Sequence, residues 1–420
     1  MSNDDKLLDF CPQSPIWSPL EEIAREGARR ILQVMLESEV NDFVKKYSDV
    51  KDESGRQSVV KNGYHPSREI MTGIGNIEVK QPRVDDRKIR KEKNVPVFNS
   101  NILPRYMRRM PSIDNLLPVL YLKGISTGDM SSSLESILGK NPKNLSPNVI
   151  VKLKSKWKEE YEKWLRRDLS KKKYVYFWVD GIYFNIRLEN EKSCLLVIIG
   201  ADATGKKELV AVSDGFRESK LSWKDVLMGL KDNGLKVGPN LAIGDGALGF
   251  WAALREVYPE TKWQRCWVHK TANILDKMPK KIQSKAKSQI HEIYMSETKK
   301  DALKAYDHFT KIYGDKYPKA VYCLKKDKEN LFTFYDFPAA HWRNIRTTNA
   351  IESTFATIRL RTSKTKGCGS RLTTLTMAWK LGMEAQKGWM KLHGSNKLKF
   401  VIEGKRFIDG ILEEDKRQVA

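Results

Sequence analysis

Residues 174–181 read Tyr174-Val175-Tyr176-Phe177-Trp178-Val179-Asp180-Gly181, an unbroken apolar run that ends in an acid. Strands buried on both faces of a sheet have this composition. Residues 241–246 repeat the pattern as Leu241-Ala242-Ile243-Gly244-Asp245-Gly246. Open α/β sheets bind ligands at the carboxyl ends of their strands, so we expect Asp180 and Asp245 to close two strands at such an edge. Taken singly, each Asp-Gly also fits an ordinary turn that terminates a strand.

Further extended segments surround these two runs. We predict strands over 182–189, 194–201, 207–213 and 240–245, with a helix near 219–232. Three mostly adjacent strands, followed by a helix and another strand, is the order of a ribonuclease H-like core. The sequence therefore predicts an α/β fold built on a core of this type.

A long helical stretch separates the second acid from a third, Glu352. Its helices are predicted over 247–257, 267–276, 281–294, 298–313 and 316–325. A core of this type needs only a short connection here, so an all-helical insertion is implied. After Glu352 the chain is again helical, through 371–392.

The third acid lies in the run Asn349-Ala350-Ile351-Glu352-Ser353-Thr354-Phe355. Asn349 and Glu352 have the N-cap and N3 spacing of a capping box, and capping alone would explain a Glu here. A second stripe, Glu352, Ala356 and Arg359, lies beside the apolar face of this helix. The small Ala356 would leave the carboxylate room to meet a metal, and Arg359 would be free to turn toward phosphate.

Two acids at strand ends and a third on a later helix suit a two-metal site that cleaves phosphodiesters. Mg²⁺ is the expected ion, with Mn²⁺ as a substitute, because carboxylate oxygens are its usual protein ligands. The composition suggests the substrate: 76 Lys and Arg against 52 Asp and Glu give a net charge of +24. Such an excess predicts attraction to nucleic-acid phosphates, although a merely basic surface is the plainer alternative.

Several other classes are disfavoured by the sequence. No apolar run approaches the ~20 residues that span a bilayer, and the start Met1-Ser2-Asn3-Asp4-Asp5 is not that of a secretory signal. We therefore expect no membrane and a cytoplasmic location. Five scattered cysteines argue against a disulfide framework. Cys266-Trp267-Val268-His269 is suggestive, but a structural zinc site needs four ligands and no second ligand pair is evident.

The first 170 residues predict a mainly helical DNA-binding region. A helix over 19–47 precedes an extended segment, 58–84, and a basic, irregular stretch, 85–110. Three helices follow, the last beginning at Ser146-Pro147 and carrying Lys152 and Lys156. This order suits a helix-turn-helix reader of the major groove, and a plain helical connector is the alternative. The apolar side of the first helix is expected to comprise Ile23, Ile31, Val34, Met35, Val40 and Phe43.

Several of these runs together resemble the Mutator-type transposases of bacterial insertion sequences. They are Asn62-Gly63-Tyr64-His65-Pro66, Val179-Asp180-Gly181, Ile243-Gly244-Asp245-Gly246, Gln264-Arg265-Cys266-Trp267-Val268-His269-Lys270, Asn349-Ala350-Ile351-Glu352-Ser353, Lys366-Gly367 and Met377-Ala378-Trp379-Lys380. They occur in the expected order from about residue 20 to 395. The resemblance implies a ribonuclease H-like nuclease whose Asp180, Asp245 and Glu352 bind metal.

In the same pattern Cys266 and His269 match a Cys-x-x-His motif of the insertion, and we expect the pair either to act near the reacting phosphate or to brace the insertion. Terminal inverted repeats and target DNA are the implied partners, and pairing of two DNA ends implies a homo-oligomer on the nucleoid. We expect DNA contacts from Arg265, Arg359, Arg361, Lys152 and Lys156. The alternatives are a nuclease or junction resolvase on the same core, or a non-catalytic, transposon-derived DNA-binding protein.

These interpretations divide the chain into six parts. They are an N-terminal helix, extended segment and basic arm (1–110), a helix-turn-helix-like region (111–172), the first part of the core (173–255), the helical insertion (256–340), the second part of the core (341–400) and a C-terminal tail (401–420).

Overall fold

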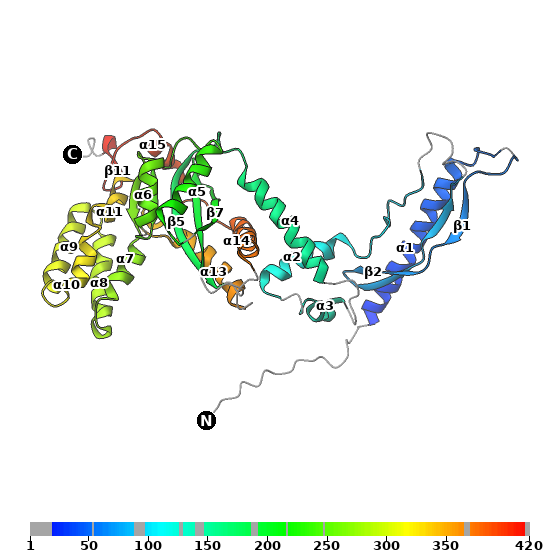
Figure 1. The fold of residues 1–420 in the computed structure, drawn as a ribbon, viewed down its shortest axis with the longest axis horizontal. Coiled ribbons are helices and arrows are strands. Elements are labelled where there is room, and N and C mark those ends of the chain that lie inside the picture. Colours follow the sequence, from blue (N-terminus) through cyan, green and yellow to red (C-terminus); the bar gives the residue numbers. More distant parts are fainter. Residues whose placement is uncertain are drawn as a thin grey trace, which may run out of the picture. The chain divides into compact units, whose positions relative to one another are not determined.

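The computed structural model describes residues 19–52, 54–87, 97–125, 129–138, 147–185, 192–215, 217–246, 248–364 and 370–415 (Figure 1). The chain divides into two compact units, residues 1–153 and 154–420. The helix start expected at Ser146, the motif Lys366-Gly367 and most of the basic run 87–91 lie outside the described residues. Within the described ranges, no helix is both long and apolar enough to cross a membrane.

The first unit packs one long helix on short antiparallel strands. Its elements are α1 (Pro19–Lys46), β1 (Val60–Tyr64), β2 (Arg68–Thr72), β3 (Gly75–Val79), β4 (Pro82–Asp85), α2 (Pro111–Lys123) and α3 (Met130–Leu138). β2 pairs with β3, and β1 pairs with β4. α2 ends at Gly124, because the left-handed φ of 113° there is readily adopted only by glycine.

The apolar side predicted for α1 is confirmed at Val40, which is 1% exposed, but it is wrong at Ile23, Ile31 and Val34. Ile23, Ile31 and Val34 are each more than 60% exposed, at 69%, 67% and 64%. The helix instead packs Leu32 and Leu36 against the strands. A helix of mixed apolar pattern offers more than one face, and the sheet selects the face with which it packs best.

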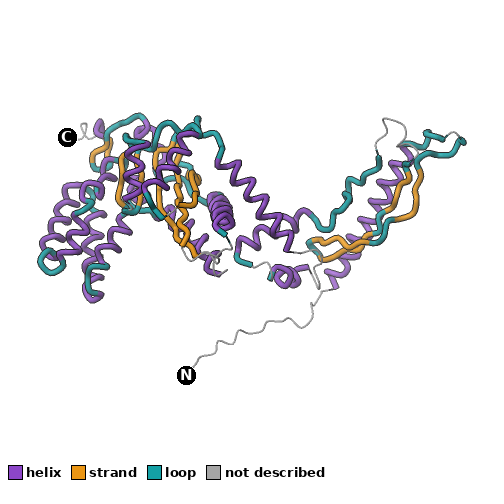
Figure 2. The backbone as a smooth tube through the Cα atoms, viewed as in Figure 1, coloured by secondary structure: helices purple, strands orange, loops and turns teal. Residues whose placement is uncertain are grey.

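A five-stranded mixed sheet organises the second unit (Figure 2). The strands are β5 (Tyr174–Asn185), β6 (Lys192–Asp202), β7 (Lys207–Gly215), β8 (Leu241–Gly244) and β9 (Lys262–Arg265), in the spatial order β7-β6-β5-β8-β9. β6 runs antiparallel to both β5 and β7, whereas β8 runs parallel to both β5 and β9. The mixed α/β class predicted from the sequence is confirmed.

The predicted end of a strand at Asp180 is wrong. β5 continues to Asn185 as one strand, and Asp180 lies within it opposite Val197 of β6. The strand continues because Ile182 and Phe184 are buried and extend the apolar pattern past the Asp-Gly pair. Asp245, by contrast, directly follows the last residue of β8, as predicted.

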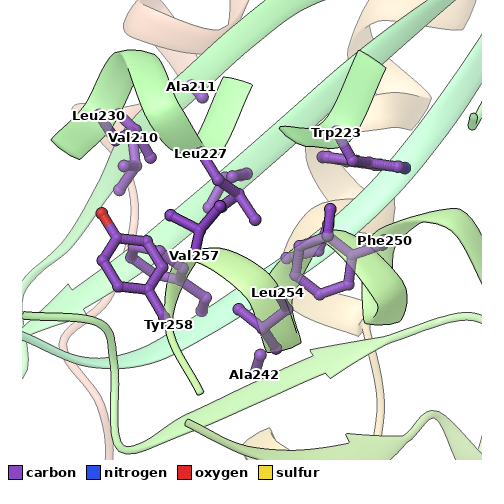
Figure 3. Close-up of a cluster of buried hydrophobic side chains, with 14 of the residues drawn as sticks. Val210, Ala211, Trp223, Leu227, Leu230, Ala242, Phe250, Leu254, Val257 and Tyr258 are labelled. Atoms are coloured by element: carbon purple, nitrogen blue, oxygen red, sulfur yellow. The ribbon is translucent and has the colours of Figure 1, made fainter. Parts of the chain in front are cut away.

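Helices α5 (Lys220–Asp232) and α6 (Leu248–Val257) build the main core on one face of the sheet (Figure 3). Trp223, Leu227 and Phe250 from these helices pack with Phe177 and Val179 of β5. Successive side chains of a strand alternate between faces, so Tyr176, Trp178 and Asp180 belong to the opposite face. Helix α13 (Asn349–Lys364) contacts β5, and α14 (Arg371–Gln386) contacts β7.

The helical stretch between β9 and α13 is close to its predicted form. It contains α7 (Trp267–Leu275), α8 (Lys280–Met295), α9 (Lys299–Tyr313), α10 (Pro318–Lys325), α11 (Lys328–Leu331), η2 (Thr333–Asp336), η3 (Ala339–His341) and α12 (Trp342–Ile345). After α14 follow η4 (Ser395–Lys397), α15 (Leu398–Ile402), β10 (Phe407–Ile408) and β11 (Ile411–Leu412). The helix predicted over 371–392 ends at Gln386, because the chain returns to the sheet, where the Leu392 amide donates to the Gly205 carbonyl at 2.8 Å.

Helix α4 (Pro147–Leu165) begins in the first unit and ends in the second. Its C-terminal half packs on α14: Tyr161 and Trp164 lie against Trp379, and Lys380 donates to Glu160 at 2.6 Å. This half is therefore part of the core, and only the N-terminal half is available to a DNA-reading role.

Candidate active site

The register of the parallel pair β5–β8 brings two acids to neighbouring positions. The ladder runs from Tyr176 opposite Leu241 to Val179 opposite Gly244. Asp180 is the next residue of β5 and Asp245 directly follows β8, so the two backbones lie side by side where the ladder ends. Each carboxylate also accepts a hydrogen bond from the amide that follows it, that of Gly181 at 2.9 Å and that of Gly246. Two separate apolar runs thus converge on one edge.

Asp180 is held in a desolvated, negatively charged environment. Burial raises the pKa of its carboxyl group to about 7, and the charges of Glu218 and Asp245 add to this rise. His269 and the Gly181 amide oppose it. A buried carboxylate with carboxylate neighbours is stabilised by any cation that enters.

Asp245 belongs to an ionic network that reaches the helical stretch between β9 and α13. Arg265, at the end of β9, donates from Nη1 to Asp245 Oδ1 and from Nε to Asp327 Oδ2 at 3.2 Å. Lys270 of α7 donates to the same Asp327 oxygen at 2.6 Å. The Arg265 and Lys270 side chains are only 6% and 2% exposed. Asp327 therefore neutralises two buried cations and connects the segment between α10 and α11 to the second acid through Arg265.

The third acid is joined to the Cys-x-x-His pair through the start of α13. Glu352 Oε1 lies 3.9 Å from His269 Nε2, and His269 Nδ1 lies 3.3 Å from the Thr348 hydroxyl. The Thr348 hydroxyl is in turn 3.3 Å from Cys266 Sγ. Cys266, His269 and Glu352 thus lie close to one another, and their membership of one catalytic site stays a prediction.

The capping-box interpretation of Glu352 is wrong. The Thr348 carbonyl accepts from the Glu352 amide at 3.2 Å, so the first helical hydrogen bond begins one residue before Asn349. Glu352 therefore lies one position beyond N3, where it cannot reach back as the box requires. The Glu352 carboxylate instead lies near the His269 imidazole.

The imidazole of His269 supplies positive charge among these acids. Its hydrogen bond with Cys266 raises the pKa of His269 to about 9, against the opposing effect of burial, and Asp245 and Asp180 add to the rise. Burial alone would raise the pKa of the Cys266 thiol, but the hydrogen bond and charge of His269 outweigh it, and the pKa is lowered. The pair favours a thiolate beside an imidazolium.

Glu218 is a fourth acid of the site that the sequence did not predict. A Cβ atom on Gly181 would lie 2.6 Å from the Glu218 carboxyl carbon, so the two residues are in direct contact. Burial raises the pKa of Glu218, and Asp245 adds to the rise. Its position between β7 and α5 carries no recognisable motif, and the glycine after Asp180 was the only local signal.

The residues expected to contact DNA differ in their exposure to solvent. Lys152 and Lys156 are exposed on α4, and Arg359 is exposed on α13. Arg265 is buried and bonded to two carboxylates, so in this structure its guanidinium faces the protein. The side chain of Arg361 lies outside the described residues. Contact of these side chains with DNA stays a prediction.

Across the described ranges, no group of three or more His, Cys, Asp or Glu side chains converges well enough to hold a metal ion. Arg265 engages Asp245, and His269 is the neighbour of Glu352. The acids therefore form an open edge with cationic partners and not a closed cage.

The chain matches one protein family and is similar in sequence to several individual proteins. Residues 8–391 match the family described as "Transposase, Mutator family". The transposase for insertion sequence element IST2 of Acidithiobacillus ferrooxidans is 52% identical over 282 residues, which cover 67% of this chain and 95% of that protein. The transposase for insertion sequence element IS6120 of Mycolicibacterium smegmatis is 48% identical over 302 residues, which cover 72% and 93%.

Proposed function

The chain belongs to the Mutator family of transposases and is a DNA transposase, and from this premise we propose that Asp180, Asp245 and Glu352 are its catalytic acids on a ribonuclease H-like core. The sheet order β7-β6-β5-β8-β9, with two antiparallel pairs followed by two parallel ones, supports a core of this type. The stretch from α7 to α12 is then the insertion between the second and third acids.

One observation carries this proposal: the β5–β8 register that ends at Val179 opposite Gly244. It places Asp180 beside Asp245 although the two acids belong to separate sequence motifs. Residues that serve as ordinary turn formers have no reason to meet at one sheet edge. Glu352 then joins them through His269, from a helix that contacts β5.

The donor set fits Mg²⁺. Asp180 and Asp245 offer hard oxygen ligands at one edge, and a desolvated carboxylate such as Asp180 favours a cation. Mg²⁺ is usually held by one or two carboxylates together with phosphate and water, so an open edge suits it. Asp180, Asp245 and Glu352 would hold the ions, which supply charge stabilisation to the reacting phosphate and lower the pKa of the attacking hydroxyl.

The other charged residues then have defined tasks. Arg265 keeps the Asp245 carboxylate oriented when no ion is bound, since its own position is fixed by Asp327. His269 neutralises part of the charge that four acids would otherwise concentrate, and Cys266 with Thr348 fixes the imidazole ring. Water is limited at Asp180 because the strand around it is buried.

The N-terminal region would grip the terminal inverted repeats of the element. Lys152 and Lys156 lie exposed on the half of α4 that does not pack on α14, where they can meet phosphates. Their contacts would make binding sensitive to salt, because neutralised phosphates release counterions. A homo-oligomer that pairs two ends is part of the same proposal.

The test uses the purified full chain and a labelled duplex that carries one end of the element. We expect strand cleavage at the end in Mg²⁺ and none in EDTA, with no cleavage of a duplex in which the end is scrambled. Equal cutting of both duplexes would favour a general nuclease. Binding to the end without any cleavage in Mg²⁺ or Mn²⁺ would favour a non-catalytic DNA-binding protein.

A further inference from the structure

A cavity of about 350 Å³ lies beside the N-terminus of α13, on the sheet face to which Trp178 and Asp180 belong. It belongs entirely to the second unit. Its wall comes from β7, α12, the start of α13 and the segment after α14. The polar and aromatic residues that line it are Lys207, Arg343, Asn344, Thr347, Asn349 and Trp389.

Lys207 is a half-buried cation without an anionic partner. In the described part of the chain, no carboxylate lies within ion-pair distance of its ammonium group, which instead sits 5.7 Å from the centre of the Trp178 ring. Burial lowers the pKa of Lys207. A partly desolvated charge that is left unpaired costs stability, and an entering anion would offset that cost.

The rest of the wall also favours an anion. Arg343 adds a second positive charge at the rim, and Asn344 and Asn349 add amide groups. The Thr347 hydroxyl is buried without a hydrogen-bond partner among the described residues. The N-terminus of α13, a helix of 16 residues, contributes the partial positive charge of its dipole.

We propose that this cavity binds a backbone phosphate of the DNA strand, with Lys207 and Arg343 on the phosphate and Trp389 against the adjoining base. The proposal rests on the proposed function, because it places the substrate strand on the transposase. Asn349, which lines the cavity, precedes Glu352 by three residues on α13. A strand held here would therefore pass next to the third acid. Stacking on an aromatic ring accepts any base, so this contact would be independent of sequence.

The test measures binding of the full chain to a fluorescent end-containing duplex in EDTA, so that cleavage plays no part. Lys207→Met is expected to weaken binding about tenfold. It should also make the slope of log affinity against log salt concentration shallower, by the amount that about one phosphate contact contributes. Arg343→Gln should act in the same direction. Lys206→Met is the matched control, because Lys206 is the exposed neighbour and does not line the cavity. It should bind within about twofold of the wild type.

Thermal unfolding separates a binding role from a structural one. Because Lys207 is an unpaired, partly buried charge, Lys207→Met should unfold at the same temperature as the wild type or higher. Lys207→Arg, which keeps the charge, should recover most of the affinity. A lower unfolding temperature in Lys207→Met, with no recovery in Lys207→Arg, would overturn the proposal.

Two further results would also contradict it. If wild-type protein binds the duplex, but Lys207→Met binds as tightly as Lys206→Met, the cavity does not hold the strand while the proposed function stands. A second contradicting result has two parts. Adenosine monophosphate displaces a fluorescent nucleotide from the wild-type protein, and Lys207→Met binds the duplex as tightly as the wild type does. The cavity then holds free nucleotide instead of the DNA strand. Failure of the wild type to bind any DNA would overturn the proposed function as well.

Discussion

Arg265 donates a hydrogen bond from Nη1 to the carboxylate of Asp245 and another from Nε to the carboxylate of Asp327. The connection runs through Asp327, which also binds the buried Lys270. Asp245 is thus oriented, through Arg265, by Asp327, which lies 82 positions further along the chain. The helical stretch between β9 and α13 therefore contributes to the geometry of the site as well as to its surroundings.

Asp327→Asn should destabilise the protein by about 3 kcal/mol, because it leaves two buried cations without their shared anion. The free energy of unfolding from a urea titration measures this. Asp301→Asn is the matched control, since Asp301 pairs with Lys304 on an exposed surface and should lower the free energy of unfolding far less than Asp327→Asn does. Equal effects of the two changes would show that the Asp327 network adds nothing to stability.

Gly246→Ala should disturb the same network from the other side. A Cβ atom on Gly246 would lie 2.5 Å from the guanidinium carbon of Arg265, so Arg265 must move away from Asp245. We expect a loss of about 1–3 kcal/mol in unfolding free energy, together with a loss of cleavage. Gly229→Ala, inside α5 with no atom within 4 Å of the added Cβ, should instead stabilise by up to about 1 kcal/mol. The account is contradicted if Gly246→Ala is also neutral or stabilising.

His341 should make the second unit less stable in acid. It is fully buried, with Nε2 donating to the Gly394 carbonyl at 2.9 Å and Nδ1 accepting from the Tyr176 hydroxyl at 2.7 Å. Burial lowers the pKa of His341, whereas an unfolded histidine takes up a proton near pH 6.5. The unfolded state therefore binds more protons, and the stability present above about pH 6.5 is lost as the pH falls below it.

Urea unfolding at pH 7.5, 6.5 and 5.5 measures this dependence. His341→Gln should be less stable than the wild type at pH 7.5, and the difference should narrow at pH 5.5. His308→Gln, on the exposed surface of α9, should keep the wild-type dependence. A His341→Gln variant that loses stability with acid as steeply as the wild type would refute the assignment.

The apolar runs before Asp180 and Asp245 were sufficient to predict two central strands, because short, unbroken apolar runs of this kind are typical of strands that are buried on both faces. They did not predict where β5 ends. Gly181 suggests a turn by itself, and only the structure shows that the Glu218 carboxylate occupies the space where a side chain would point. Local propensity was overruled here by a contact between distant residues.

Asp327, Lys207 and Glu218 were beyond prediction for a related reason. Each acts through partners that are far away in sequence, and none lies in a recognisable pattern. The same limit explains α1, whose pattern offered two apolar stripes and whose strands bury Leu32 and Leu36. Spacing along one helix states which residues share a face, but not which face finds a partner.

Cys266→Ser should leave the fold intact and lower strand cleavage. Cys266 is fully buried, and a serine hydroxyl can keep the contact with Thr348 while losing the sulfur whose hydrogen bond with His269 raises the pKa of that imidazole. Circular dichroism and the cleavage assay measure the two effects. Purified wild-type protein with about one tightly bound Zn²⁺ per chain would contradict this role, because the pair would then be structural ligands.

Substitution of the three acids tests the proposal that Asp180, Asp245 and Glu352 are catalytic. An amide keeps the shape of a carboxylate but removes the charge that holds Mg²⁺, and residues that act as a unit fail together. Asp180→Asn, Asp245→Asn and Glu352→Gln should therefore each abolish cleavage while end binding remains. Glu256→Gln is the matched control, because Glu256 pairs with Lys220 and Lys224 on the surface of α6.

The most direct measurement is strand cleavage of an end-containing duplex in Mg²⁺ by Glu352→Gln, with binding of the same duplex measured alongside. We predict wild-type binding and at least a thousandfold slower cleavage, on the order expected when a catalytic group is removed. Cleavage at the wild-type rate would remove Glu352 from the catalytic acids and contradict the proposed site.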